Sequence, residues 1–247
     1  MRFIRSLLLL VSLVLIAIAC GSACTFAFPF MSVNRRYRMG TYWCRAMLFA
    51  ARWLAGIRYR VEGAENLPDA PAIVLSKHQS AWETFALPVI MTRPLCFVFK
   101  RSLLLIPFFG WSLNMVKMIH IDRKDARHAF ASIAEQGRRR TDEGAWVVMF
   151  PEGTRTAPGQ RIKYKTGGAR CAVALNVPVI PVALNAGHVW PRNSFIKYPG
   201  TVTVSIGKPI DTAGLSTDEV NQRVEDWIEG EMRRIDPGAY RLTNPAG

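Results

Sequence analysis

The N-terminus of the chain carries its longest apolar run. No residue between Ser6 and Asn34 is charged, which gives more than the about 20 apolar residues that cross a bilayer. Gly21 and Ser22 lie near the centre of the run, and Pro29 follows. Basic residues flank it on both sides: Arg2, Arg5, Arg35, Arg36 and Arg38. This pattern fits a re-entrant hairpin with both ends in the cytoplasm, and a single span with the rest of the chain cytoplasmic fits equally.

A second helical pattern follows at 42–59. Its apolar positions recur at helical spacing, with arginines between them: Trp43, Met47, Ala50, Trp53, Leu54 and Ile57, with Arg45, Arg52 and Arg58. Such a helix suits the lipid interface, and its apolar face would equally suit packing on a core. A cleavable signal peptide fits poorly, because the apolar run continues past any plausible cleavage point. We therefore expect residues 1–58 to form a membrane-anchoring helical segment.

From about Val61 short apolar runs alternate with helical patterns. The strand candidates are 72–76, 95–99, 118–121, 145–150, 178–184 and 201–206. Their continuous apolarity indicates strands that are buried on both faces. Helical stripes occur at 125–140 (Ala126, Ala129, Phe130, Ile133 and Ala134) and after Ser216, which forms a capping box with Glu219 ahead of Val220, Val224, Trp227 and Ile228. The pattern predicts one α/β domain at 59–240, with a largely buried mixed sheet covered by helices, and a tail at 241–247.

The charge balance points to an anionic partner. Lysine and arginine number 32 against 18 acidic residues, a formal net charge of +14. A membrane surface, a phosphorylated substrate, an acidic carrier protein or a nucleic acid would each suit this charge. The basic residues are dispersed and resemble no nucleic-acid module, so we expect no nucleic-acid partner. The five cysteines are scattered without a Cys/His cluster, which favours a reduced compartment, no disulfide framework and no metal.

His78 and Glu83 are the first candidate catalytic pair. His78 directly follows a buried-strand pattern, at the carboxyl end where open α/β sheets place their sites. Five positions differ by about 140° on a regular helix, so the two side chains would not share a helical face. With Ser80 as the N-cap of a following helix, His78 lies in the entry loop and Glu83 in the first or second turn. The chain then folds back and lets Glu83 reach the imidazole.

A second constellation follows the strand at 145–150. Glu152, Gly153, Thr154 and Arg155 form a polar turn, in which glycine allows close backbone approach and arginine grips phosphate bidentately. An ordinary turn with a Glu–Arg pair is the plain alternative. Lys163 and Lys165 then precede Gly167-Gly168 and a helical run, an arrangement favourable to anions. The order of glycine and lysine differs from that of a P-loop.

Four motifs occur in the order and spacing of the acyltransferase blocks: "KHQSAWET", "FKRSLLLIPFFGW", "MFPEGTR" and "VPVIPVAL". The sequence therefore resembles the glycerolipid acyltransferases, most closely the bacterial 1-acylglycerol-3-phosphate acyltransferases, over roughly residues 60–210. The resemblance implies that His78 is the general base for the acceptor hydroxyl, which attacks the acyl thioester without a covalent acyl-enzyme. Glu83 stands where the family has aspartate, and the resemblance implies that it orients the imidazole.

The other blocks supply expected substrate contacts. By resemblance the second block places Lys100, Arg101, Pro107 and Gly110 near the acceptor, with either basic residue as a phosphate contact. The third block contributes Glu152, Gly153, Thr154 and Arg155, of which Arg155 is the preferred phosphate ligand. The fourth block, at 177–182, either shapes the acyl or acceptor channel or is simply a buried strand.

The resemblance implies acyl transfer from acyl-CoA or acyl carrier protein to the sn-2 hydroxyl of lysophosphatidic acid (1-acylglycerol-3-phosphate), forming phosphatidic acid without a cofactor. Another lysolipid, such as lyso-ornithine lipid, is an alternative acceptor, and a non-catalytic basic protein that binds membrane lipids is an alternative of another class. A serine esterase using Ser76 or Ser80 would lack the G-x-S-x-G elbow. We expect the enzyme at the inner (cytoplasmic) membrane, with its catalytic domain facing the cytoplasm.

Overall fold

The computed structural model describes residues 1–106, 109–121 and 126–241. A seven-stranded sheet lies at its centre, in the order β1-β7-β6-β2-β5-β3-β4. Its strands are β1 (Ile57–Glu62), β2 (Ile73–Ser76), β3 (Leu95–Lys100), β4 (Ile119–Ile121), β5 (Trp146–Met149), β6 (Val179–Leu184) and β7 (Gly200–Ile206). All neighbouring pairs are parallel except β6 and β7, which are antiparallel. The mixed, largely buried sheet expected from the sequence is confirmed.

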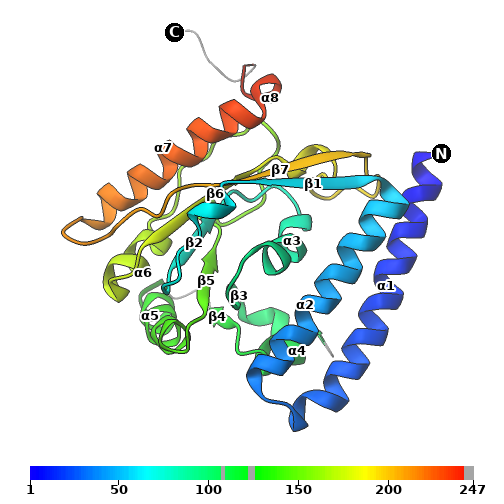
Figure 1. The fold of residues 1–247 in the computed structure, drawn as a ribbon, viewed down its shortest axis with the longest axis horizontal. Coiled ribbons are helices and arrows are strands. Elements are labelled where there is room, and N and C mark those ends of the chain that lie inside the picture. The colour runs from blue at the N-terminus through cyan, green and yellow to red at the C-terminus, as the bar shows by residue number, and fades with distance from the viewer. Residues whose placement is uncertain (107–108, 122–125, 242–247) are drawn as a thin grey trace.

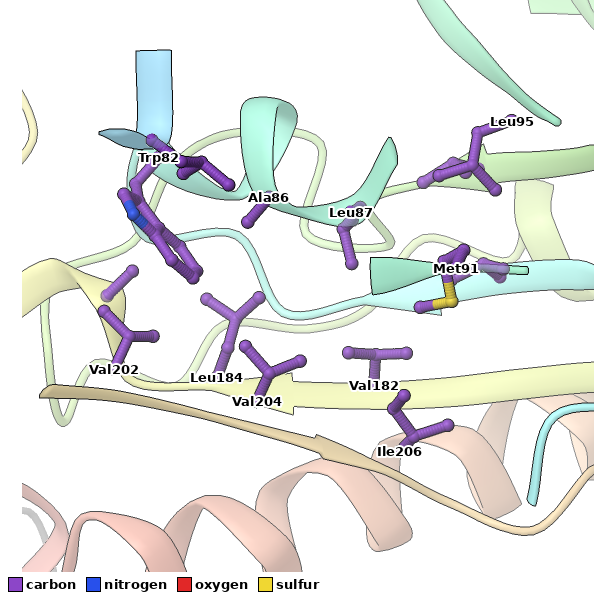
Figure 2. Close-up of a cluster of buried hydrophobic side chains, with 14 of the residues drawn as sticks. Trp82, Ala86, Leu87, Met91, Leu95, Val182, Leu184, Val202, Val204 and Ile206 are labelled. Carbon is purple, nitrogen blue, oxygen red and sulfur yellow. The ribbon is translucent and has the colours of Figure 1, made fainter. Parts of the chain in front are cut away.

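Helices cover both faces of this sheet (Figure 1). On one side lie α1 (Arg2–Ala27), α2 (Val33–Ala50), α3 (Trp82–Ile90) and α4 (Phe109–Met115); on the other lie α5 (Ala126–Asp142), α6 (Gly167–Leu175) and α7 (Thr217–Ile235), followed by α8 (Pro237–Arg241). Side chains of one strand alternate between the two layers, so Val74 packs with the α3 side while Ile73 and Leu75 pack with the α6 side. Figure 2 shows Trp82, Ala86 and Leu87 of α3 above strands β6 and β7.

All six strands expected from the sequence are present, but β1 was missed. The sequence interpretation continued a helix through Ile57 to residue 59, and this is wrong. The helical backbone ends in a π-turn, Ala51–Ala55, because Gly56 takes the left-handed conformation at φ +74°. β1 then pairs with β7 at the edge of the sheet and exposes Arg58, Tyr59 and Arg60. An edge strand with exposed polar positions lacks the continuous apolar run that marked the central strands.

The two helical patterns outside the sheet are confirmed where the structure describes them. In α5 Ile133 is buried and Phe130 half-buried, whereas the side chains of Ala126 and Ala129 lie outside the described part of the chain. Helix α7 begins with the expected capping box, in which the Ser216 side chain accepts from Glu219 N. The stripe that α7 buries against the sheet is Val220, Val224, Ile228 and Met232, with Trp227 at its margin.

The N-terminal apolar run is one helix that passes through Gly21 and Ser22 without a break. The chain turns at Phe28–Phe30 with Pro29, and α2 returns alongside α1 as a hairpin (Figure 1). Within the described residues, α1 is the one helix with the length and apolarity to cross a membrane. Ser6, Leu9 and Cys24 are buried on its inner side. Its outer face exposes large apolar side chains: Phe3, Ile4, Leu7, Leu8, Leu10, Val11, Val14, Leu15 and Ile18.

Helix α2 packs on the core, which is one of the two roles that the sequence left open. Cys44, Met47 and Leu48 are buried, whereas Phe49 is 65% exposed and Tyr42 is also exposed. One face of the helix therefore packs on the core, while these aromatic side chains of the other face remain exposed.

Candidate active site

Strands β2 and β5 bring the two candidate motifs together. They are parallel neighbours in register from Ile73↔Val147 to Leu75↔Met149, so both end at the same edge of the sheet. His78 follows β2 by two residues and Glu152 follows β5 by three. Residues 74 positions apart in the sequence thus come into direct contact, with His78 N donating to Glu152 Oε2 at 2.6 Å.

The imidazole of His78 is held by Glu83. His78 Nδ1 lies 2.9 Å from Glu83 Oε1, and the same oxygen accepts Gln79 N at 2.8 Å and Ser80 N at 2.7 Å. Because an ionised carboxylate only accepts, this contact favours the neutral tautomer with the hydrogen on Nδ1 and the lone pair on Nε2. The ring also stacks on Phe150 with 3.8 Å between centroids. The side chain of His78 is 14% exposed and that of Glu83 is fully buried, so the imidazole reaches the surface and the carboxylate does not.

The loop and helix that make this contact match the expectation, except that the N-cap of the helix lies one residue later. Glu83 lies in the first turn of α3, as expected. The N-cap is Ala81 and not Ser80, but the Ser80 hydroxyl still accepts Trp82 N at 3.0 Å. Residues 77–81 form the entry loop, and the backbone N–H groups of Gln79 and Ser80 turn towards the Glu83 carboxylate. The glutamate's longer side chain therefore reaches Nδ1 at hydrogen-bond distance.

Glu152 lies inside the protein. Its side chain is completely buried; Oε2 accepts His78 N and Oε1 accepts Thr156 Oγ1 at 2.7 Å. Thr156 N also donates to His78 O at 2.8 Å, and Thr156 Oγ1 lies 3.2 Å from the same carbonyl oxygen. The turn after β5 thus holds the backbone of His78 from both sides, and the Glu152 carboxylate faces these groups and not the surface.

The rest of this turn is accessible. Gly153 has φ +68°, and a Cβ there would lie 2.7 Å from Lys165 Nζ. Thr154 is exposed and Arg155 half-buried. The Arg155 carbonyl accepts a hydrogen bond from Arg192 at 2.7 Å, which brings a second guanidinium beside it. Arg155 is therefore partly accessible from outside.

The second motif block begins at the end of β3, the strand next to β5 in the sheet. Lys100 ends β3, which neighbours β5, and both Lys100 and Arg101 are exposed at the edge of the sheet that carries His78. Gly110 is buried in α4, where a Cβ would lie 2.4 Å from Leu103 O, so this position requires glycine to let the chain pack. Pro107 lies outside the described residues.

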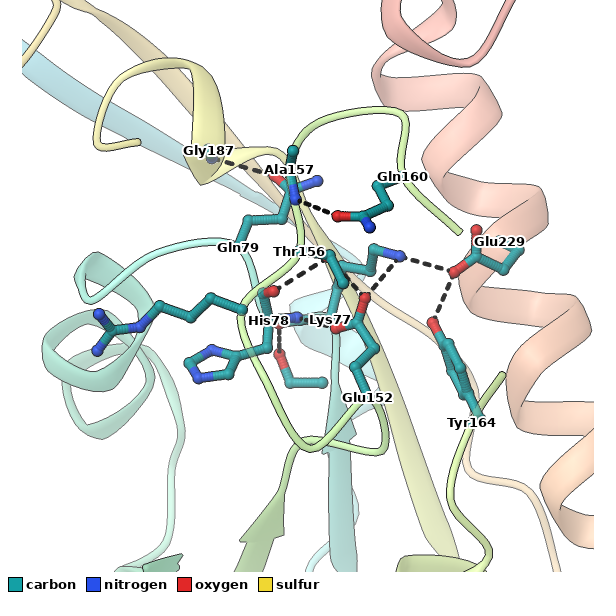
Figure 3. A network of polar contacts seen from close by, with 12 residues as sticks. Lys77, His78, Gln79, Glu152, Thr156, Ala157, Gln160, Tyr164, Gly187 and Glu229 are labelled. Atoms are coloured by element: carbon teal, nitrogen blue, oxygen red, sulfur yellow. Dashed lines mark hydrogen bonds and ion pairs between the residues drawn. The ribbon is translucent and has the colours of Figure 1, made fainter. Parts of the chain in front are cut away.

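A buried lysine was missed by the sequence analysis. Lys77 is fully buried, and its Nζ lies 2.8 Å from both Glu152 Oε1 and Glu229 Oε1 (Figure 3). Burial alone would lower the pKa of Lys77, but the charge of Glu152, followed by the interactions with Tyr240 and Glu229, holds this pKa above its ordinary value. Glu229 is on α7, 152 residues away in the sequence. A charged residue between a buried strand and His78 was the available signal for Lys77, whereas nothing in the sequence singles out Glu229 among the acids of α7.

The fold and this site define a class. The Acyltransferase family model matches residues 58–185, the part of the chain that runs from β1 to the end of β6 and holds His78, Glu83 and Arg155. The chain belongs to this family.

Individual relatives show which acyltransferases the chain is similar to. The chain is 43% identical to the 1-acyl-sn-glycerol-3-phosphate acyltransferase of Pseudomonas aeruginosa, across 98% of this chain and 95% of the relative. It is 29% identical to 1-acyl-sn-glycerol-3-phosphate acyltransferase alpha of Mus musculus, across 78% of this chain and 69% of the relative. The crystal structure of the 1-acyl-sn-glycerophosphate (LPA) acyltransferase PlsC from Thermotoga maritima has the same fold, with a TM-score of 0.76, 24% identity and full coverage of both chains.

Proposed function

We propose that this protein transfers a fatty acyl group from an acyl thioester to the sn-2 hydroxyl of 1-acylglycerol-3-phosphate, which yields phosphatidic acid. The observation that carries the proposal is the His78–Glu83 pair, with Nδ1 held at 2.9 Å and Nε2 left as the basic nitrogen. The near full-length likeness to the Pseudomonas aeruginosa enzyme supports lysophosphatidic acid as the acceptor.

The proposed reaction needs one base and two substrates. His78 Nε2 takes the proton of the acceptor hydroxyl as its oxygen bonds to the thioester carbonyl carbon. The carbon–sulfur bond of the tetrahedral intermediate then breaks, and the proton passes from His78 to the departing thiolate. Glu83 stabilises the imidazolium that exists between these two proton transfers. The protein supplies no cofactor and no metal in this scheme, because the thioester is already activated.

Cationic side chains suit the phosphate of the acceptor. Arg155 is partly accessible on the turn that holds the His78 backbone, and arginine binds phosphate bidentately. Lys100 and Arg101 are exposed two strands from β2 at the same edge. We assign Arg155 as the main phosphate ligand, and Lys100 or Arg101 as a second contact.

The outer face of α1 suits a lipid surface. α1 packs along α2 and the domain, with Ser6 Oγ accepting Lys197 N at 2.9 Å near one end and Arg36 of α2 donating to Met115 O at 3.1 Å near the other. The hairpin of α1 and α2 is thus held to the domain through α1 at one end and through α2 at the other, and a helix held along a domain in this way suits a membrane interface. We propose that α1 inserts its apolar face into the inner membrane from the cytoplasmic side, which brings the site to the lysolipid.

An acceptor panel tests the proposal. Purified protein is given lysophosphatidate, lysophosphatidylcholine or lyso-ornithine lipid in mixed micelles, with acyl-CoA or acyl carrier protein as donor, and products are quantified by mass spectrometry. The proposal expects phosphatidic acid from lysophosphatidate with at least one donor. Acylation of another lysolipid but not of lysophosphatidate would overturn the acceptor, and no acylation of any acceptor would overturn the activity.

A further inference from the structure

The backbone of His78 is held by hydrogen bonds that lie outside the sheet. Lys77 N still donates to Val182 O at 2.9 Å, which continues the ladder between β2 and β6. At His78 the chain leaves the sheet. From there its N–H is bound by Glu152 and its carbonyl by Thr156. The place of the imidazole in the site therefore depends on how firmly Glu152 itself is held.

Glu152 is held by a buried ionic network, which comprises Lys77, Glu152, Glu229 and Tyr164. Lys77 Nζ is 2.8 Å from Glu152 Oε1 and 2.8 Å from Glu229 Oε1. The Tyr164 hydroxyl donates to Glu229 Oε1 at 2.8 Å. Figure 3 shows Lys77 between the two carboxylates, with Glu229 reaching in from α7 and the imidazole of His78 pointing away from the network.

The network joins three segments that are distant in the sequence. Lys77 follows β2, Glu152 follows β5, and Glu229 lies on α7, beyond the 58–185 that the family model matches. The chain of contacts runs from Glu229 to Lys77, from Lys77 to Glu152 Oε1, and from Glu152 Oε2 to His78 N. A helix outside the four motif blocks thus reaches the catalytic histidine through two ionic contacts and one hydrogen bond.

Stability alone is a weak reason for such a network. Taking charges out of water is costly, and well-packed apolar residues of similar volume often replace a buried ion pair with no loss of stability. Positioning is a better explanation of the network. The Lys77 ammonium is held between the carboxylates of Glu152 and Glu229, and this contact restricts Glu152 to one orientation. An uncharged contact would constrain the carboxylate less, and a misplacement of the base by about 1 Å can cost about 10²-fold in rate.

We infer that Glu229 is a positioning residue for acyl transfer, acting through Lys77 and Glu152 to fix the backbone of His78. The inference rests on the proposed function. Glu229 does not touch substrate in this role. Its loss therefore changes the turnover of bound substrates and leaves their binding nearly intact.

The test is Glu229→Gln, which keeps the shape and hydrogen-bonding oxygen of the side chain and removes its charge. The matched control is Glu225→Gln, one turn earlier on α7, where the carboxylate pairs with the exposed Arg161 at 2.8 Å. Both variants are assayed with lysophosphatidate and with the acyl donor that wild type accepts, acyl-CoA or acyl carrier protein, below their melting temperatures. Rates are divided by the folded fraction from circular dichroism. We expect kcat of Glu229→Gln to fall at least about tenfold with acceptor KM within about twofold, and Glu225→Gln to match wild type.

The outcomes separate the inference from the function on which it rests. A wild-type enzyme that fails to acylate lysophosphatidate with either acyl-CoA or acyl carrier protein refutes the proposed function itself. If wild type is active and folded Glu229→Gln keeps its kcat within about twofold, the positioning role is wrong. A fall in kcat that vanishes after correction for folded fraction also shows a purely structural role. If Glu229→Gln does not fold, Tyr164→Phe is tested in its place, because it removes one hydrogen bond to Glu229 and leaves every charge in place. A lowered kcat with an unchanged KM then supports the inference, and an unchanged kcat overturns it.

Discussion

The contact between His78 and Glu83 makes a sharp prediction for Glu83→Gln. Glutamine has the same shape, and its Oε1 can still accept the backbone N–H groups of Gln79 and Ser80, so the entry loop should keep its fold. What the substitution removes is the negative charge beside the imidazole. That charge matters most when the imidazole has taken the proton of the acceptor hydroxyl, because only then does the ring carry a positive charge.

The size of the effect follows from the geometry. His78 Nδ1 and Glu83 Oε1 are 2.9 Å apart, which places the delocalised charges about 4 Å from each other. At an effective dielectric constant of about 20, two unit charges at about 4 Å interact by about 4 kcal/mol. If this stabilisation is lost only in the transition state, kcat falls by about 10³-fold while acceptor KM changes little.

The assay measures initial rates of phosphatidic acid formation at a saturating concentration of the acyl donor that wild type accepts, with lysophosphatidate varied. Circular dichroism and a thermal melt confirm that the variant is folded. A kcat within about threefold of wild type would refute the reasoning, since the buried carboxylate would then contribute no charge stabilisation to the reaction. A large rise in KM at constant kcat would also refute it, because it would place Glu83 in substrate binding.

Three further predictions address the phosphate, the membrane and the buried lysine. Arg155→Ala should raise the KM for lysophosphatidate by about 10- to 100-fold and leave kcat nearly unchanged, because about 1.5–3 kcal/mol of charged hydrogen bonding to phosphate is lost; an unchanged KM in steady-state assays would exclude this contact. Leu8→Glu on the outer face of α1 should weaken sedimentation with phosphatidylglycerol vesicles by at least about tenfold, because about 1.5–3 kcal/mol of apolar burial is lost; equal loss in the exposed control Ala213→Glu would contradict it. Lys77→Met should lower the free energy of unfolding in urea by about 3–5 kcal/mol at pH 8. The folded pKa of Lys77 is raised above its ordinary value of 10.5, so its stabilisation persists below that pH and is lost as pH rises through the folded pKa; a difference from wild type that does not shrink above pH 10.5 would contradict this assignment.

The sequence predicted the parts of the fold whose physics is local. Central strands such as 178–184 are continuous apolar runs because both faces are covered, and the capping box at Ser216 needs only its own neighbours. Strand β1 escaped detection because an edge strand can expose Arg58 and Arg60, which removes the apolar signal. The end of the preceding helix depended on the left-handed backbone of Gly56, a cue that the strong helical periodicity around it concealed.

In the candidate site, too, the sequence predicted contacts between neighbouring residues and missed contacts between distant ones. Glu83 contacts His78 because His78 lies in a loop and Glu83, five residues later, lies in the first turn of the following helix. Both features are local, so the sequence could suggest this contact. The burial of Glu152 could not be read locally, because its partners Lys77 and Thr156 meet it only when β2 and β5 pair. Glu229 is still harder to find, since its partner Lys77 is 152 residues away and α7 carries other acids that look the same in sequence.

The most direct measurement of the central claim compares wild type with His78→Ala in one assay of phosphatidic acid formation from lysophosphatidate, with acyl-CoA and acyl carrier protein tested as donors. The wild-type protein should form phosphatidic acid with at least one donor, and folded His78→Ala should lose at least about 10³-fold in kcat, as expected when a general base is removed. A His78→Ala variant that forms phosphatidic acid at the wild-type rate would contradict the account.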